Sequence, residues 1–299
     1  MPTATVNGVS LYYEEHGEGI PLIFIHEFAG DYRSWVPQVR HFARRYRTIT
    51  YNARGYPPSA VPEDPAAYSQ DMAVADLVGL MDHLGIDQAH VVGFSMGGSA
   101  ALVFGIRHAA RARSLVIAGT GSGSTGKKED FVRDVEYVAN RFFNEGMDTV
   151  ADFYTRGPNR VQFEEKDPLG WQEFYDNFRG SSAQGHGLTM LGVQRNRPSV
   201  HELEVELKQM TIPTLIIVGD EDEPCLEPGL FLKRTIASAA LVTFPKTGHT
   251  LNLEEPELFN RTVQDFLSQV DAGRWSLRNP KSLSRSAVLS PDEAANADK

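Results

Sequence analysis

The sequence predicts an α/β fold whose sheet is doubly wound and mostly parallel. Short apolar runs rich in β-branched residues recur along the chain, and several are apolar at successive positions, as expected of strands buried on both faces. Segments with helical periodicity separate these runs, and this alternation is typical of a parallel sheet covered by helices. In chain order, strands are expected at residues 8–15, 21–28, 46–52, 90–95, 114–119, 214–220 and 240–245.

Helical periodicity is clearest in two segments of the chain. In 69–86, apolar residues that include Leu77, Leu80 and Leu84 repeat at the spacing of one helix face, and a similar pattern spans 254–270. Both segments lie between or after expected strands. We therefore expect them to form helices that pack on the sheet.

The alternation of strands and helices is interrupted in the middle of the chain. Residues 121–210 carry aromatic and charged segments of helical type but no buried-strand run. We therefore expect a mostly helical cap, or lid, inserted into a core that comprises 1–120 and 211–272. The remaining residues, 273–299, are polar and poor in large apolar side chains, so we expect them to form a mobile tail.

Length and composition limit the classes of function. With 299 residues, 41% of them hydrophobic, the chain can bury a large core. The formal net charge of −10 argues against a nucleic-acid partner, because such binding depends on clustered lysine and arginine. The first residues show no basic segment followed by an apolar stretch, and no later run approaches the roughly 18 apolar residues of a membrane span, so we expect neither a secretion leader nor a membrane-spanning segment. Because Cys225 is the single cysteine, no internal disulfide is possible. We expect a cytoplasmic protein without a membrane partner; its oligomeric state is not readable.

A candidate nucleophile lies where the strand expected at 90–95 ends. Gly93-Phe94-Ser95-Met96-Gly97 is a G-x-S-x-G motif between an apolar strand and a helical run that begins with small residues. A sharp strand-to-helix turn needs little bulk two residues on either side of the serine. Such a turn lifts the Ser95 hydroxyl above the sheet edge, next to the free N–H groups of a helix N-terminus.

A serine nucleophile needs a base within hydrogen-bond distance, and the base needs an acid that orients it. With a nucleophile on this kind of turn, the partners follow in the chain order serine, acid, histidine. His249, in a loop just past the last strand, is the histidine that lies beyond the expected acid. Asp222 is the favoured acid because the chain passes the strand end before this carboxylate turns inward, and Asp220 is the alternative.

Together these motifs resemble the α/β-hydrolase superfamily, specifically a serine hydrolase with a helical cap. The likeness extends over most of the chain and implies the fold and the Ser95, Asp222 and His249 triad, with no cofactor. The segment "YNARGYPPS" is similar to the D-x-R-G-x-G-x-S segment of the family but carries Asn52 in the first position. By the same resemblance, 121–210 is the cap that covers the site and selects the substrate.

The resemblance also implies an oxyanion hole made by the backbone N–H groups of Phe28 and Met96. The family usually has His-Gly after this strand, whereas this chain has His26 followed by Glu27. If the glycine position requires a positive φ, glutamate is strained there and the loop must adopt another geometry. We expect the His26 ring to brace the loop.

The role of Glu27 is left open by the sequence. One hypothesis is a carboxylate that faces solvent or pairs with a nearby arginine such as Arg54. The other is a negative charge at the pocket mouth that disfavours anionic substrates or takes part in proton transfer. A zinc site is not expected, because H-E-x-x-H needs a second histidine where this chain has Gly30. No metal is predicted elsewhere.

The favoured function is hydrolysis of a small carboxylic ester or lactone through an acyl-enzyme on Ser95. One alternative is hydrolysis of a carbon–carbon bond in a β-diketone-like acid, because relatives with Ser-Met-Gly-Gly at this turn include such enzymes. Another alternative is a ligand receptor on the same fold without catalytic activity. In each case the expected partner is a small molecule.

Substrate contacts are expected from the cap. The candidates are Trp171, His186 and Met190, together with Phe142, Phe143, Tyr154 and Phe174. Arg195 and Arg197 are candidates to hold a substrate carboxylate, although exposed cap arginines are the simpler interpretation. The sequence does not identify which of them line the pocket.

Overall fold

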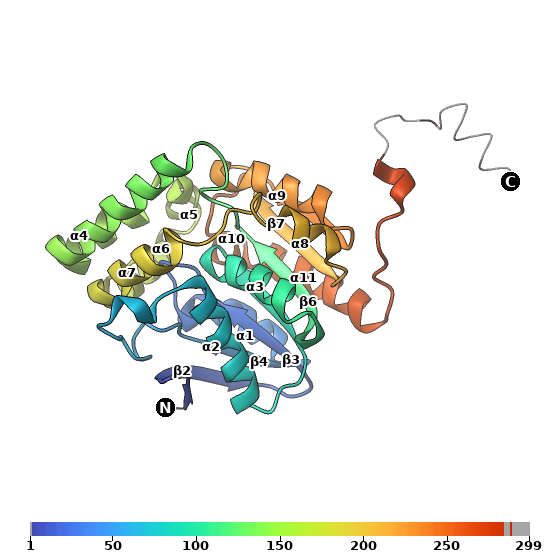
Figure 1. The fold of residues 1–299 in the computed structure, drawn as a ribbon, viewed down its shortest axis with the longest axis horizontal. Helices are drawn as coiled ribbons and strands as arrows, with labels where there is room; N and C mark the ends of the chain where they lie inside the picture. Colours follow the sequence, from blue (N-terminus) through green and yellow to red (C-terminus); the bar gives the residue numbers. More distant parts are fainter. Residues whose placement is uncertain (1, 284–287, 289–299) are drawn as a thin grey trace, which may run out of the picture.

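The computed structural model describes residues 2–283 and 288, and within them eight strands form one sheet (Figure 1). Its strand order is β1-β2-β4-β3-β5-β6-β7-β8. β1 and β2 are antiparallel to their neighbours, and the strands from β4 to β8 are parallel. The strands are β1 (Thr3–Val6), β2 (Val9–His16), β3 (Ile20–Ile25), β4 (Tyr46–Tyr51), β5 (Ala89–Phe94), β6 (Ala112–Ala118), β7 (Thr214–Gly219) and β8 (Ala239–Phe244).

The predicted fold class is confirmed by this sheet and by the helices between its strands. The helices of the described residues are α1 (Val36–Phe42), α2 (Gln70–His83), α3 (Met96–Arg107), α4 (Lys128–Thr155), α5 (Val161–Lys166), α6 (Pro168–Arg179), α7 (Ala183–Thr189), α8 (Glu204–Gln209), α9 (Glu223–Thr235), α10 (Leu251–Glu254) and α11 (Pro256–Asp271). Short 3₁₀ turns include η1 (Tyr32–Trp35), η2 (Pro65–Ala67) and η4 (Pro158–Arg160), and η5 (Met190–Gln194) is a π-helix.

The helices cover both faces of the sheet. One apolar cluster joins the sheet to α2, α3 and α9, with Leu77, Phe104 and Leu232 buried in it. A second cluster joins the opposite face to α1 and α11, through residues such as Phe42 and Phe259. Burial on both faces explains why the central strands have near-continuous apolar sequences.

The parallel strands bring four chain segments to one edge of the sheet. Ser95 follows β5, Asp222 follows β7 and His249 follows β8, while the 26–30 loop follows β3. β3, β5, β6, β7 and β8 are consecutive neighbours in the sheet, so their carboxyl ends lie side by side. Ligands of open α/β sheets bind at this edge.

Between β6 and β7 the chain forms the helices α4 to α8, and α4 to α7 lie together over one end of the sheet (Figure 1). A third apolar cluster fills this helical insertion with aromatic side chains such as Phe142 and Phe178. Phe28, from the 26–30 loop, and Met96, the first residue of α3, belong to the same cluster. The division into a core and a cap at 121–210 stays a prediction, but these contacts define where the insertion lies.

The chain after α11 makes defined contacts with the core, in the part of the expected tail that the structure describes. Trp275 Nε1 donates a hydrogen bond to Ser238 O (2.7 Å), and its ring packs on Phe266. The Arg278 guanidinium donates to the carbonyl oxygens of Lys233 and Arg234. The expected mobile tail otherwise falls mainly on 284–287 and 289–299, outside the described residues.

Among the described residues, none of the helices combines the length and apolar character that a membrane span requires. The cytoplasmic location expected from the sequence stays a prediction.

Candidate active site

Ser95 lies on a sharp turn between β5 and α3, with φ 54° and ψ −109°. The turn depends on the glycines of the G-x-S-x-G motif. A side chain at position 97 would collide with the backbone carbonyls of Ile25 and His26, and one at position 93 would meet the backbone of Gly97 and Gly98. Because these backbone atoms cannot move aside, both positions of the motif require glycine.

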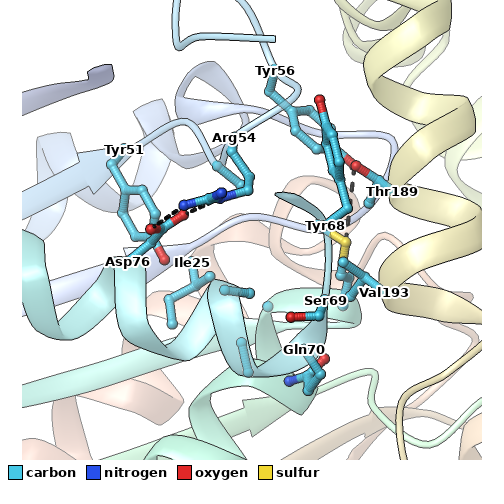
Figure 2. A pocket seen from close by; sticks show the side chains of 15 residues that line it. Ile25, Tyr51, Arg54, Tyr56, Tyr68, Ser69, Gln70, Asp76, Thr189 and Val193 are labelled. Atoms are coloured by element: carbon cyan, nitrogen blue, oxygen red, sulfur yellow. Dashed lines mark hydrogen bonds and ion pairs between the residues drawn. The ribbon is translucent and has the colours of Figure 1, made fainter. Parts of the chain in front are cut away.

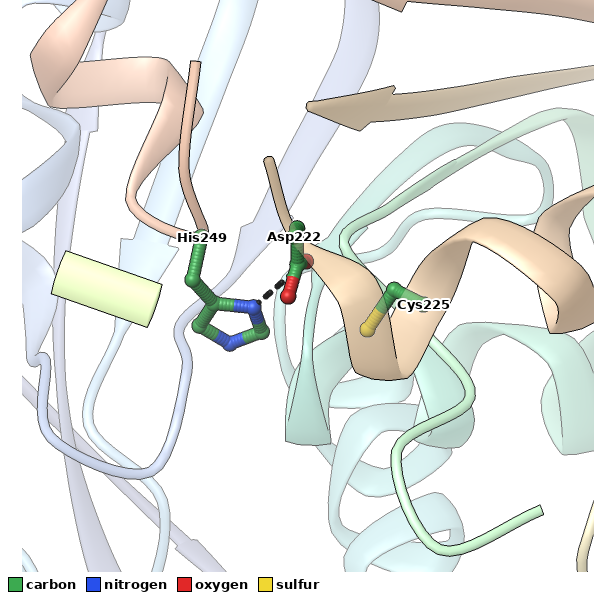
Figure 3. A group of neighbouring side chains, drawn as sticks. All are labelled: Asp222, Cys225 and His249. Atoms are coloured by element: carbon green, nitrogen blue, oxygen red, sulfur yellow. Dashed lines mark hydrogen bonds and ion pairs between the residues drawn. The ribbon is translucent and has the colours of Figure 1, made fainter. Parts of the chain in front are cut away.

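Ser95, His249 and Asp222 form a hydrogen-bonded chain. His249 Nε2 lies 2.9 Å from Ser95 Oγ, and His249 Nδ1 lies 2.7 Å from Asp222 Oδ2 (Figure 3). Burial by itself raises the pKa of Asp222, but the interactions with His249, Cys225 and Arg160 together outweigh it and lower that pKa below its usual value. Asp222 is therefore ionised at neutral pH and accepts a hydrogen bond from the Nδ1–H tautomer of His249.

Asp220, the alternative acid, has a different partner. Its Oδ1 accepts a hydrogen bond from the backbone N–H of Thr247 at 3.1 Å, so it holds the loop that precedes His249 instead of the imidazole. The His249 backbone N–H itself donates to Asn159 O in the helical insertion at 2.7 Å. The histidine loop is thus fixed from the core and from the insertion.

Cys225 lies beside this chain, one turn into α9 (Figure 3). Side-chain ligand atoms of Asp222, Cys225 and His249 lie within 4.8 Å of one another, which is the geometry of a possible metal site. Metal binding by cysteine requires the thiolate, but burial, reinforced by Asp222, raises the Cys225 pKa well above its usual value. The donor set therefore fits a hydrogen-bonded acid and base better than a metal site.

The 26–30 loop is braced by His26. The ring donates from Nδ1 to Glu27 O (2.6 Å) and accepts the Ala53 N–H at Nε2 (3.0 Å). Burial lowers the pKa of His26, consistent with a neutral ring in this tautomer. Because a trans peptide holds its C=O and N–H in opposite directions, fixing the Glu27 carbonyl also fixes the Phe28 N–H. This N–H has no acceptor within the part of the chain that the structure describes.

Glu27 is buried, 1% exposed, and forms an ion pair with Arg160 in η4. The expected pair with an arginine is confirmed, but the partner is Arg160 and not Arg54, and the solvent-facing alternative is wrong. Arg54 instead forms a two-pronged pair with Asp76 on α2, at 2.6 Å and 2.7 Å (Figure 2). Glu27 also has no positive φ, so the predicted backbone strain is absent at this position.

Arg160 is a site residue that sequence reasoning missed. Its guanidinium meets both Glu27 oxygens, with Nη1–Oε1 at 3.1 Å and Nη2–Oε2 at 2.5 Å, and Nη1 also donates to Thr250 Oγ1 at 2.7 Å. Glu27 and Arg160 are 133 residues apart in sequence. The one signal in the sequence for such a pair was the acidic residue Glu27 in the 26–30 loop, and it did not specify which arginine is the partner.

Ser95 and His249 line a cavity of about 430 Å³ between the sheet edge and the insertion. Of the predicted substrate contacts, Met190 and Tyr154 line this cavity. Trp171 and His186 do not, which corrects the prediction. Trp171 stacks on Tyr175 and donates from Nε1 to Thr155 O, inside the insertion. His186 is buried among aromatic rings, those of Phe28, Phe142, Phe178 and Tyr56.

A second, smaller cavity lies behind the nucleophile turn and is lined by Arg54, Tyr56, Met96 and Thr189, among others (Figure 2). Its volume of about 30 Å³ is close to that of a single water molecule. The larger cavity is therefore the candidate substrate site.

Arg197 faces the larger cavity, and none of the described residues gives it an acidic partner. It donates to three neutral oxygens, those of Gln194 Oε1 (2.7 Å), Ser99 Oγ (3.0 Å) and Ser122 O (2.7 Å). Burial lowers its pKa, the direction expected when no carboxylate compensates for lost hydration. Arg195, the other predicted anion ligand, instead pairs with Glu136 on the outer side of the insertion.

The sheet, the nucleophile turn and the Ser95–His249–Asp222 chain are those of an α/β hydrolase. A family model described as "alpha/beta hydrolase fold" matches residues 20–256, and the chain belongs to this family. It is therefore an enzyme of the hydrolase class.

Several named relatives match over about 90% of the chain. The 2-hydroxymuconate semialdehyde hydrolase of Pseudomonas sp. (strain CF600) is 31% identical, with 90% of this chain and 94% of the relative covered. The 3-oxoadipate enol-lactonase 2 of Acinetobacter baylyi is 26% identical, with 89% and 96% covered. Among solved structures, the enol-lactonase from Burkholderia xenovorans LB400 has a TM-score of 0.79 and 28% identity, with 89% of this chain and 100% of that chain covered.

Proposed function

We propose that the protein hydrolyses a small carboxylic ester or lactone through an acyl-enzyme on Ser95. The observation that carries the proposal is the hydrogen-bonded chain from Ser95 Oγ through the His249 imidazole to Asp222. A serine hydroxyl becomes a competent nucleophile when such a base removes its proton during attack.

In the first step, Ser95 Oγ attacks the substrate carbonyl carbon while His249 Nε2 takes the hydroxyl proton. Asp222 holds the imidazole in the required tautomer and stabilises its cation without taking the proton. When the tetrahedral intermediate collapses, the carbon–oxygen bond to the leaving group breaks and His249 returns the proton to that oxygen. A water molecule then attacks the acyl-enzyme with His249 again as base, which releases the acid and restores Ser95.

The negative oxygen of each tetrahedral intermediate is assigned to an oxyanion hole formed by the N–H groups of Phe28 and Met96. The Met96 N–H is at the first position of α3, where helix N–H groups lack intrahelical partners. Hydrogen-bond donors at this point typically contribute 10² to 10³ in kcat each. In this proposal the insertion is a cap that closes the site from solvent.

The surroundings of Arg197 favour a substrate that carries a carboxylate. Arginines, namely Arg156, Arg160 and Arg197, line the cavity, and in the described chain its lining includes no aspartate or glutamate. Arg156 pairs with Asp152 and Arg160 with Glu27, which leaves the Arg197 charge for a ligand. The names of the relatives fit this assignment, since oxoadipate and hydroxymuconate semialdehyde are both carboxylic acids.

One relative favours a second candidate function. The 31% identical protein is named as a 2-hydroxymuconate semialdehyde hydrolase, which cleaves a carbon–carbon bond. The same nucleophile, base and arginine suit a β-diketone-like acid, so the reacting bond is decided by assay.

The test compares wild-type protein with Ser95→Ala on p-nitrophenyl butyrate, a panel of lactones and a diketone acid. We expect Ser95-dependent turnover of esters or lactones and labelling of Ser95 by a fluorophosphonate. A kcat/KM at least 100-fold higher for the diketone acid than for every ester and lactone would select the second function. If the fluorophosphonate does not label Ser95 and no turnover depends on Ser95, the serine-hydrolase proposal is wrong.

A further inference from the structure

Two consecutive residues of the cap, Asn159 and Arg160, contact both loops that flank Ser95. Asn159 O accepts the backbone N–H of His249 at 2.7 Å. Arg160 binds both carboxylate oxygens of Glu27 and the hydroxyl of Thr250, the residue after His249. One short segment, η4, thus holds the loop of the base and the loop of the oxyanion hole at the same time.

The contact at Glu27 acts on the peptide group that carries the proposed oxyanion donor. The Glu27 carbonyl accepts hydrogen bonds from His26 Nδ1 (2.6 Å) and from the Gly30 N–H (3.3 Å). Its carboxylate is held by Arg160. The Glu27 carbonyl, and with it the direction of the Phe28 N–H, is therefore fixed by contacts within the core, while the side chain of the same residue is held by the cap.

The Glu27–Arg160 ion pair is buried away from water, so breaking it is costly. Glu27 is 1% and Arg160 3% exposed, and the guanidinium lies 5.5 Å from the Tyr154 ring centre and 5.2 Å from that of Phe174. Separating two buried charges leaves each without compensation, so the two residues move together. Displacement of the cap from the core at η4 would pull on the Phe28 peptide.

We propose that Glu27 and Arg160 are positioning residues that make hydrolysis depend on docking of the cap. The inference rests on the proposed function, because it assigns the Phe28 N–H to the oxyanion hole. It gives Glu27 a task that neither sequence hypothesis contained. The carboxylate neither faces solvent nor acts on the substrate, but connects the cap to the catalytic backbone.

Two variants test the proposal without leaving a buried charge alone. Glu27→Met with Arg160→Met removes both charges and retains apolar side chains, so the fold is kept while the tie is lost. Arg160→Lys keeps the charge, but an ammonium cannot hold both Glu27 oxygens and Thr250 in one plane. We expect kcat for p-nitrophenyl butyrate, per Ser95 labelled by a fluorophosphonate, to fall at least 10-fold in the double variant and about fivefold in Arg160→Lys, with KM changed less than threefold.

A second readout separates positioning from a loss of folded protein. A phenylboronic acid forms a tetrahedral anion on Ser95, so its affinity depends on the oxyanion donors and not on how much protein is active. We expect this affinity to weaken together with kcat in both variants. The control is Arg33→Met, which removes a different contact between core and insertion, Arg33 Nη2 to Asn177 O at 3.3 Å, and should leave kcat and boronate affinity within twofold.

The proposal would be overturned if either folded variant kept both its kcat and its boronate affinity within twofold of the wild-type values. If the double variant does not fold, Arg160→Lys decides alone. Failure of the proposed function is recognised separately, because wild-type protein would then show no Ser95-dependent turnover or labelling. Labelled, active wild type with unaffected variants refutes only the role of Glu27 and Arg160.

Discussion

The Asp222 carboxylate lies 2.7 Å from His249 Nδ1, while the neighbouring acid Asp220 accepts from a backbone N–H of the histidine loop. The two acids are two residues apart, at the end of the same strand. Their different partners make them a matched pair for testing the proposed mechanism.

Asp222→Asn is expected to lower kcat about 10⁴-fold, because the amide favours the wrong tautomer of His249. Asp220→Asn should lower kcat less than about 10-fold, since its side-chain oxygen can still accept from Thr247. The measurement is kcat for p-nitrophenyl butyrate from pH 6 to pH 9. Equal losses in the two variants would contradict the assignment of Asp222 as the orienting acid.

Removing one partner of the buried pair should destabilise the protein strongly. Glu27→Gln leaves the Arg160 charge buried and uncompensated, and we expect the free energy of unfolding in urea to fall by about 3 to 5 kcal/mol. The double change to methionine at both positions should cost less than the single change, because it leaves no buried charge. A double variant that is less stable than Glu27→Gln would show that packing, and not charge, holds this contact.

The sequence predicts the parts of the molecule that depend on local patterns. The strands of the parallel sheet follow from the apolar runs in the sequence. The nucleophile turn follows from glycines at fixed spacing, because a side chain at those positions would collide with nearby backbone atoms. β1 was not predicted, although Asn7 and Gly8, with φ of 46° and 77°, form a tight hairpin turn before β2. That dipeptide is a recognised hairpin signal.

The parts that could not be predicted depend on long-range packing. Nothing near Arg160 in the sequence indicates that it lies against Glu27, since the way the insertion folds over the sheet brings them together. Trp171 and His186 were reasonable pocket candidates by residue type, but aromatic side chains also fill the interior of a helical insertion. Which aromatic residue reaches the cavity is decided by helix orientation.

His186 makes stability depend on pH. Burial lowers the pKa of His186 from 6.5 to about 4, so the unfolded chain binds its proton more readily than the folded protein does. Between about pH 6.5 and pH 4 the free energy of unfolding should therefore fall as the pH falls, by about 3 kcal/mol from this group. The loss is absent above the unfolded pKa.

The measurement is urea unfolding of wild type and His186→Gln from pH 4 to pH 8. Below pH 6.5 the free energy of unfolding of the variant should depend less steeply on pH, and the difference in slope should correspond to the binding of about one proton. Values at pH 8, where neither state holds the proton, give the packing cost separately. An unchanged slope would contradict a neutral buried imidazole.

Arg197 is expected to select substrates with a carboxylate. Arg197→Met should lower kcat/KM for an ester with a terminal carboxylate, such as p-nitrophenyl hemiglutarate, by roughly 10- to 100-fold, the range of a charged hydrogen bond. Kcat/KM for p-nitrophenyl valerate, which has a similar length but no charge, should change less than threefold. Arg195→Met is the matched control, because Arg195 lies two residues away and pairs with Glu136 outside the cavity. Equal losses on charged and neutral esters would assign Arg197 a structural role, through its bonds to Ser99 and Ser122, instead of substrate recognition.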